Sequence, residues 1–223
     1  MNLYYHPVSP NSHKVLLALH EKGIAFQGEV VQILDGAALE AYRANVNPLG
    51  KVPFLVTDDG QRIPESTIIL DYLDRAFPSP SLIPKDPQDA LRARLLERMA
   101  DLWLVQKLAL IFFDARKPPE KRNPDAVEIA RKQLARGVAY LDDAIGTRTF
   151  AAGRELSIAD LTISAAVFFS QVARIPIGTH AVGSGVAHGA PHIQSWFERT
   201  SRRPSWERIR KDAEPYLAAL AKG

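Results

Sequence analysis

The chain has 223 residues and no cysteine. Disulfide bonds, thiolate metal sites and a cysteine nucleophile are therefore excluded. Any thiol chemistry would have to use a thiol that a ligand brings into the site.

Features of membrane proteins and of nucleic-acid-binding proteins are also missing. No apolar stretch is long enough to span a bilayer, and the first ten residues lack the basic start and apolar run of a signal peptide. The formal charge is only +3 at pH 7, and basic residues are interleaved with acidic ones. We therefore expect a cytoplasmic protein that binds neither membranes nor nucleic acid.

What the sequence does contain divides into two halves, and the first half alternates strand and helix signals. Strands are predicted at residues 2–5, 26–33, 52–56 and 61–63. Helices are predicted at residues 12–22 and 37–44, and from residue 66 onward. Asp58-Asp59-Gly60 predicts a tight turn between the last two strands. The order is strand, helix, strand, short helix, two strands and helix, which indicates an α/β domain over residues 1–77.

The second half is predicted to be all-α. Residues 78–87 carry four prolines and no periodic apolar face, which is typical of a linker. Beyond it, strand signals largely vanish over residues 88–223. Amphipathic helices are predicted at about residues 88–116, 124–145, 157–175 and 191–201.

Short motifs along nearly the whole chain resemble those of the cytosolic glutathione transferases, in the same order. They are Asn47-Pro48-Leu49-Gly50-Lys51-Val52-Pro53, Pro64-Glu65-Ser66, Leu156-Ser157-Ile158-Ala159-Asp160, Pro191-His192-Ile193-Gln194-Ser195-Trp196 and Arg203-Pro204. The resemblance implies a thioredoxin-like domain that binds glutathione, followed by a helical domain with a second-substrate pocket. Ser157 and Asp160 have capping-box spacing, which we interpret as a folding element and not as a site.

The resemblance also implies which residues hold glutathione. A cis bond before Pro53 would turn the backbone of Val52 outward to pair with the cysteinyl part of the ligand, although Pro53 could simply lead a strand. Glu65 would take the γ-glutamyl ammonium, and Ser66 at a helix start its carboxylate. A plain N-cap with a surface glutamate is the alternative. Lys51 could reach the glycyl carboxylate or could be a solvated surface lysine.

The thiol of glutathione must become a thiolate to attack. The loop Val8-Ser9-Pro10-Asn11-Ser12 resembles the serine-type loops of the theta and zeta classes, with Ser9 as the hydroxyl donor to sulfur. Its Pro10-Asn11 also resembles the nu class, in which asparagine joins in. Tyr5 is the rival donor, because other classes use a tyrosine at the end of this strand. We favour Ser9, since a helix dipole lies beside it.

Three neighbouring residues receive structural assignments. Ser12 is interpreted as the N-cap of the first helix, and His13 and Lys14 as exposed residues of its first turn. Asp35-Gly36-Ala37-Ala38 departs from theta members, which carry a histidine in that loop.

Candidates for the second-substrate pocket are Phe112, Phe113 and Arg116, near the end of the first long helix of the second domain. Trp206 and Tyr216 could close the same cleft. An aromatic stripe of this kind is more often core than pocket.

The function that the resemblance implies is a detoxifying homodimeric transferase that adds glutathione, as co-substrate, to a hydrophobic electrophile. Alternatives are a glutathione-dependent disulfide reductase or isomerase, and a non-catalytic binding protein on the same fold. No metal is expected, because His180, His188 and His192 match no rigid ligand set. A mobile loop is expected over residues 177–190.

Overall fold

A computed structural model describes residues 1–177 and 189–220, which form two compact units. The first unit contains residues 1–82 together with the helix that starts at Pro204, and the second contains residues 83–203. In the described residues, no helix is both long enough and apolar enough to cross a membrane.

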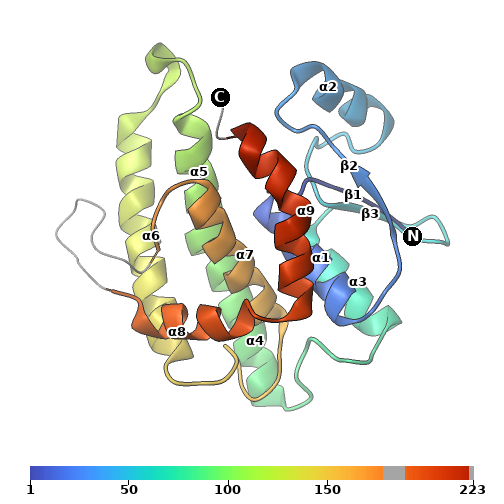
Figure 1. Cartoon of the computed structure of the whole chain (residues 1–223), viewed down its shortest axis with the longest axis vertical. Helices are drawn as coiled ribbons and strands as arrows, with labels where there is room; N and C mark the ends of the chain where they lie inside the picture. The colour runs from blue at the N-terminus through green and yellow to red at the C-terminus, as the bar shows by residue number, and fades with distance from the viewer. Residues whose placement is uncertain (178–188, 221–223) are drawn as a thin grey trace. The chain divides into compact units, whose positions relative to one another are not determined.

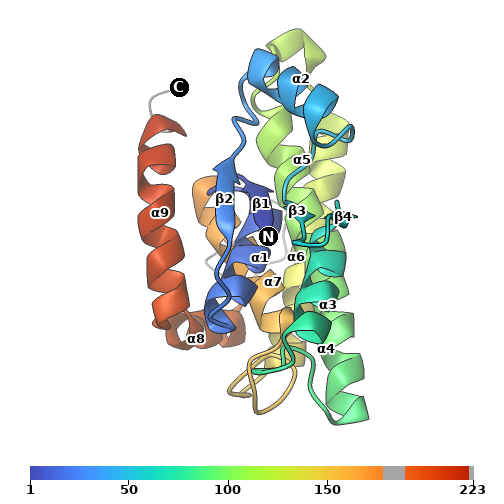
Figure 2. The same cartoon turned by 90° about the vertical axis from the view of Figure 1, so that its right-hand side faces the viewer.

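The first unit is built on a four-stranded mixed sheet, and its fold is thioredoxin-like. Strand β1 pairs in parallel with β2 and antiparallel with β3, and β3 pairs antiparallel with β4, so the order is β2-β1-β3-β4 (Figure 2). The strands are β1 (Asn2–Tyr5), β2 (Gln27–Val30), β3 (Phe54–Val56) and β4 (Arg62–Ile63). The predicted hairpin is confirmed, with Gly60 at a φ of 83° in its turn.

Four helices complete this unit: α1 (Pro10–Glu21), α2 (Gly36–Asn45), α3 (Ser66–Ala76) and α9 (Pro204–Leu220). Helix α1 contacts both α3 and α9, which lies beside it in Figure 1. It ends at Glu21 with Lys22 as its C-cap, and the next residue, Gly23, has a φ of 64°, a left-handed conformation that glycine adopts without steric cost.

Every residue of α1 from position 12 to position 19 is buried, so the expectation that His13 and Lys14 are exposed is wrong. The ring of His13 lies 5.5 Å from that of Trp206 on α9. Lys14 Nζ donates a hydrogen bond to Thr67 Oγ1 on α3 at 3.3 Å. Both side chains are covered because helices pack on two sides of α1, and an amphipathic pattern within α1 cannot reveal that.

Every secondary-structure element found in the described residues of the second unit is a helix or a helical turn. Its elements are α4 (Pro87–Ala100), a π-helical turn (Asp101–Val105), α5 (Gln106–Asp114), a 3₁₀ turn (Pro119–Lys121), α6 (Pro124–Ile145), α7 (Ile158–Val172) and α8 (Pro191–Thr200). Residues 158–170 of α7 are all buried, which marks it as the central helix. Ser157 and Asp160 form the expected capping box, and Asp160 Oδ1 also accepts from Trp196 Nε1 at 3.0 Å.

Two features differ from the predicted organisation. The helix predicted over residues 88–116 is divided by the π-helical turn into α4 and α5. The compact units also do not follow the predicted boundaries at residues 77 and 88, since α9 groups with the first unit and not with the helical one.

Candidate functional site

The proposed ligand-binding residues gather at one edge of the sheet. Tyr4 lies opposite Phe54, and Leu55 lies opposite Ile63. If the β1–β3 pairing is continued by two residues, His6 lies opposite Val52. If the β3–β4 pairing is continued by three residues, Val52 lies opposite Ser66. The segments after β1, before β3 and after β4 therefore meet at the same edge, where α1 and α3 also begin.

The loop before β3 presents an unpaired stretch of backbone. The Val52–Pro53 peptide bond is cis, as the resemblance implies. The preceding carbonyl, that of Lys51, is held by Tyr42 Oη at 2.9 Å and Asn47 Nδ2 at 2.8 Å. No backbone hydrogen bond of Val52 occurs within residues 1–177 and 189–220. The Val52 N–H and C=O are thus available to an extended ligand, as a strand edge would be.

Glu65 and Ser66 form the start of α3. Glu65 occupies the N-cap position with extended backbone, and its side chain makes no capping hydrogen bond. Its carboxylate is exposed, whereas Ser66 is only 6% exposed. At a helix start without a side-chain cap, a first-turn N–H such as that of Ser66 can donate to an anion. Lys51, the residue before Val52, is exposed.

Ser9, and not Ser12, is the N-cap of α1, so the Ser12 assignment is wrong. Ser9 Oγ accepts from the Ser12 N–H at 3.4 Å, and Pro10 occupies the first helical position, where its missing N–H costs nothing. Ser12 is fully buried, and its Oγ accepts from the His6 N–H at 3.3 Å. A serine hydroxyl has one donor and two acceptor lone pairs. Ser9 can therefore cap the helix and still donate its proton.

Asn11 stands directly after Pro10 in the first turn of α1 and is partly exposed. Its backbone N–H has no hydrogen-bond partner among residues 1–177 and 189–220. This N–H and the Ser9 hydroxyl are two donors at the positive end of the same helix dipole.

His6 lies beside the candidate donor Ser9, and the sequence analysis did not single it out. Its Nδ1 accepts from the Val8 N–H at 3.3 Å, and its carbonyl accepts from the Ser9 N–H at 3.0 Å. Its ring packs edge-on against Tyr216 at 5.3 Å. Burial lowers the pKa of His6 to about 4, so the ring is neutral at pH 7 and carries its proton on Nε2. His6 thereby fixes the turn that presents Ser9.

Tyr5 faces a different part of the unit. A methyl group built on Gly28 of β2 would stand 3.0 Å from Tyr5 Cε1 and 3.6 Å from its hydroxyl. Burial raises the pKa of Tyr5, and the charge of Asp212 and the ring hydroxyl of Tyr216, both on α9, raise it further. The phenol therefore lies over β2 and toward α9, whereas Val52 lies on the β3 side of β1.

Two family models match the chain. The model described as "Glutathione S-transferase, N-terminal domain" matches residues 3–81, and "Glutathione S-transferase, C-terminal domain" matches residues 104–204. Together they cover most of its length. The chain belongs to the cytosolic glutathione transferase superfamily.

Individual relatives of this glutathione transferase family member are distant but match over nearly full length. Glutathione S-transferase 2 of Saccharomyces cerevisiae is 26% identical over 94% of this chain and 89% of its own. A stringent starvation protein A homolog of Coxiella burnetii is 27% identical over 92% and 90%. A glutathione S-transferase structure from Methylobacterium radiotolerans, in complex with glutathione sulfonate, superposes with a TM-score of 0.80 at 26% identity and 93% coverage of both chains.

The three residues predicted for the second-substrate pocket of this family member differ in exposure. Phe112 is 5% exposed and belongs to the core, with its ring 5.2 Å from that of Phe169. The guanidinium of Arg116 stacks on the Phe112 ring at 3.5 Å and donates to the Phe112 carbonyl at 3.2 Å. Phe113 is 48% exposed. Only Phe113 and Arg116 therefore present a surface to a ligand.

Trp206 and Tyr216 were the two residues expected to close the cleft, and Trp206 does not do so. Trp206 is 2% exposed and packs against His13, so it is part of the core of the first unit. Tyr216 is partly exposed and contacts His6. His180 and His188 lie outside the described residues. Among the residues that are described, no group of His, Cys, Asp or Glu is suited to a metal ion.

Proposed function

We propose that this chain binds glutathione at the sheet edge and activates its thiol as a thiolate for attack on a hydrophobic electrophile. The observation that carries the proposal is the meeting of three segments at one edge, each with the donor or acceptor that one part of the tripeptide needs. The glutathione sulfonate bound to the Methylobacterium relative supports the choice of ligand.

Each part of glutathione has a proposed partner. The Val52 backbone pairs with the cysteinyl residue, Ser66 and the α3 N-terminus hold the γ-glutamyl carboxylate, and Glu65 holds the ammonium. Lys51 is exposed and reaches the glycyl carboxylate as a point charge. The cysteinyl sulfur then lies next to the first turn of α1.

Ser9 is proposed as the donor to sulfur, with the Asn11 N–H or side chain beside it. Lowering a thiol pKa from about 8.5 by two units requires about 2.7 kcal/mol of preferential stabilisation of the anion. A hydrogen bond to a charged group contributes roughly 1.5–3 kcal/mol, and a helix N-terminus adds about 0.3–1 kcal/mol. The two effects together amount to about 1.8–4 kcal/mol, a range that includes the required value. The position of Tyr5 over β2 supports Ser9 over Tyr5 as the donor.

In the second unit, Phe113 and Arg116 are the proposed contacts for the electrophile. The Phe112 ring, on which the Arg116 guanidinium stacks, holds Arg116 in place. A homodimer is proposed from the family alone. Binding and positioning of the two reactants would supply the rest of the catalysis.

A second candidate function is binding without catalysis, favoured by the similarity to a stringent starvation protein A homolog. Isothermal titration with glutathione, combined with turnover assays, distinguishes these functions. Binding with conjugation of an aryl halide or an enal supports the transferase. Binding with turnover only of a model disulfide supports the reductase alternative. Absence of binding at millimolar glutathione would exclude both enzymatic functions.

A further inference from the structure

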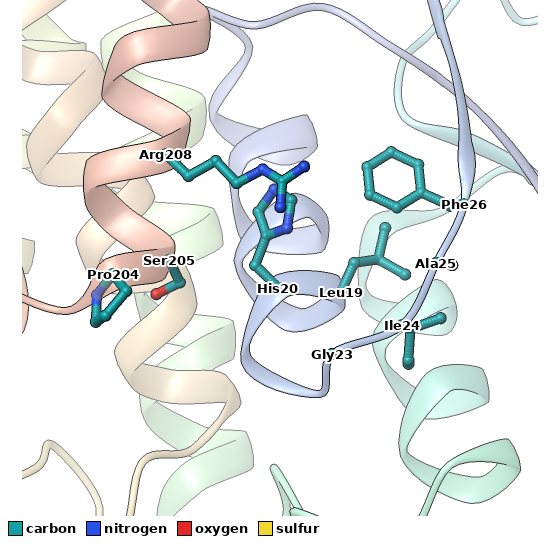
Figure 3. A pocket seen from close by; sticks show the side chains of 9 residues that line it. All are labelled: Leu19, His20, Gly23, Ile24, Ala25, Phe26, Pro204, Ser205 and Arg208. Carbon is teal, nitrogen blue, oxygen red and sulfur yellow. The ribbon is translucent and has the colours of Figure 1, made fainter.

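A cavity of about 510 Å³ lies in the first unit, at the end of α1 that is remote from Ser9. Nine residues line it, from the last turns of α1, the loop 23–26 and the first turns of α9 (Figure 3). Cavities of about 300–1,000 Å³ have the size of small-molecule sites.

One wall of the cavity is apolar and aromatic. The ring of Phe26 faces that of His20 at 5.9 Å between centroids, and Leu19 lies beside them (Figure 3). The loop that carries Phe26 is fixed by hydrogen bonds from the Gly23 N–H to the His20 carbonyl at 3.2 Å and from the Ile24 N–H to the Leu19 carbonyl at 2.9 Å. The wall is therefore formed before any ligand arrives.

The other wall carries a positive charge. Arg208 extends from α9 across His20 toward Phe26 (Figure 3). Its guanidinium forms no hydrogen bond or ion pair within the part of the chain that the structure describes. The nearby acidic groups are Glu21, whose carboxylate accepts from the Ser205 hydroxyl, and Asp212, four residues beyond Arg208 on α9.

The pKa of His20 responds to these charged groups. Burial lowers its pKa, and the charge of Arg208 lowers it further, although Asp212 and Glu21 act in the opposite direction. At neutral pH the imidazole is therefore uncharged, and Arg208 supplies the positive charge at the cavity. An anion at this place would offset the effect of Arg208 on the imidazole.

We propose that this cavity binds a small aromatic carboxylate, with the carboxylate on the Arg208 guanidinium and the ring against Phe26. The planar fork of a guanidinium matches a carboxylate with two parallel hydrogen bonds. A flat ring pairs with Phe26 and covers apolar surface that water now contacts. The neutral His20 ring, which also lines the cavity, has one N–H donor of its own.

The site is separate from the proposed glutathione edge. Ser9 precedes α1 and His20 lies in its last turn, so the two are roughly 16 Å apart along the helix axis at 1.5 Å per residue. Occupancy of one should not exclude the other.

The test uses 2-naphthoate as the probe and the full chain. Titration calorimetry should give saturable binding, and 2-naphthamide, which lacks the charge, should bind the parent protein about tenfold or more weakly. Arg208→Gln should weaken 2-naphthoate binding by a similar factor. Arg210→Gln removes the same charge about half a turn away on α9 and should leave binding unchanged. The His20 imidazole resonances should titrate at higher pH when 2-naphthoate is bound.

Three results would overturn the proposal. One is equal affinity for 2-naphthoate and 2-naphthamide, a comparison that needs no variant. Another is an unchanged affinity in folded Arg208→Gln, with unperturbed His20 resonances. The third is competition between 2-naphthoate and glutathione, which would place the probe at the sheet edge. A failure of glutathione to bind would contradict the proposed function and leave this test intact.

Discussion

His6 Nδ1 lies 3.3 Å from the backbone nitrogen of Val8 and accepts its hydrogen. The His6 carbonyl also accepts a hydrogen bond from the Ser9 N–H. His6 therefore closes the turn that places the Ser9 hydroxyl at the N-terminus of α1. His6→Leu removes the acceptor and should raise the pKa of the bound glutathione thiol. His6→Asn supplies an amide oxygen near the position of Nδ1, so its thiol pKa should lie between those of His6→Leu and the parent protein. Thiolate absorbance against pH measures the effect.

The control for this prediction is the affinity for glutathione. Since the proposed γ-glutamyl contacts, Glu65 and Ser66, lie at the start of α3 and not in the turn that His6 closes, both variants should bind glutathione with little change in Kd. A His6→Leu protein that keeps the parent thiol pKa would show that the turn does not depend on His6.

Ser9→Ala should act in two ways, because the hydroxyl caps α1 and is the proposed donor to sulfur. Loss of an N-cap side chain should lower the free energy of unfolding by about 1 kcal/mol. Loss of the donor should raise the thiol pKa and shift the pH profile of kcat/KM upward, with Kd nearly unchanged.

A matched control separates these two effects. Asn123 caps α6 in the second unit through a 2.9 Å bond to the Ala126 N–H. Asn123→Ala should lose similar stability without moving the thiol pKa. Tyr5→Phe should change neither quantity. The opposite pattern, with Tyr5→Phe shifting the thiol pKa and Ser9→Ala silent, would assign the sulfur to tyrosine.

Ser66→Ala and Glu65→Ala should each weaken glutathione binding by about 1.5–3 kcal/mol and raise KM more than they lower kcat. The reason is that, in the proposed complex, these residues hold the γ-glutamyl end, remote from the reacting sulfur. Glu29→Ala, which removes an exposed carboxylate from β2 of the same unit, is the control and should have no effect. Parent-like affinity in both variants would refute the γ-glutamyl assignment.

Stability should fall in mild acid because two buried histidines resist protonation. Burial lowers the pKa of His6 to about 4 and that of His13 to about 3, whereas both titrate near 6.5 when unfolded. The unfolded chain therefore binds more protons between these values, and the free energy of unfolding decreases as pH falls from about 6.5 toward 4. At about 1.36 kcal/mol per pH unit, His6 alone contributes on the order of 3 kcal/mol.

Urea unfolding at several pH values between 4 and 7 measures this slope. His13→Leu removes one of the two titrating groups at similar volume and should make the slope shallower. An unchanged slope in that variant would show that His13 does not remain neutral in the folded protein.

Much of the fold follows from local sequence. Asp58-Asp59-Gly60 predicted the β3–β4 turn, and Ser157 with Asp160 predicted the start of α7, because turns and capping boxes depend on a few adjacent residues. The cis bond before Pro53 came from the family resemblance. The N-cap of α1 was misassigned by three positions even though Pro10, a residue favoured at the first helical position, indicates Ser9.

The rest depended on contacts between distant segments. Nothing in the first twenty residues indicates that His13 is buried, because Trp206, nearly two hundred residues later, covers it. The role of His6 likewise follows from a turn geometry and from Tyr216 on α9. A Pro204 start with Trp206, Ile209 and Ala213 at helical spacing could have predicted α9 itself, but not the unit to which it belongs.

The membership of α9 in the first unit affects how the protein is made on the ribosome. Residues 1–82 emerge first, yet the helix that covers His13 follows only after more than a hundred further residues of the other unit. At about 5–20 residues per second, the uncovered face of α1 stays open for several seconds or longer during synthesis. Nascent chains stalled before Pro204 should therefore hold a loosened α1, and chaperones that recognise exposed apolar surface should bind them until release.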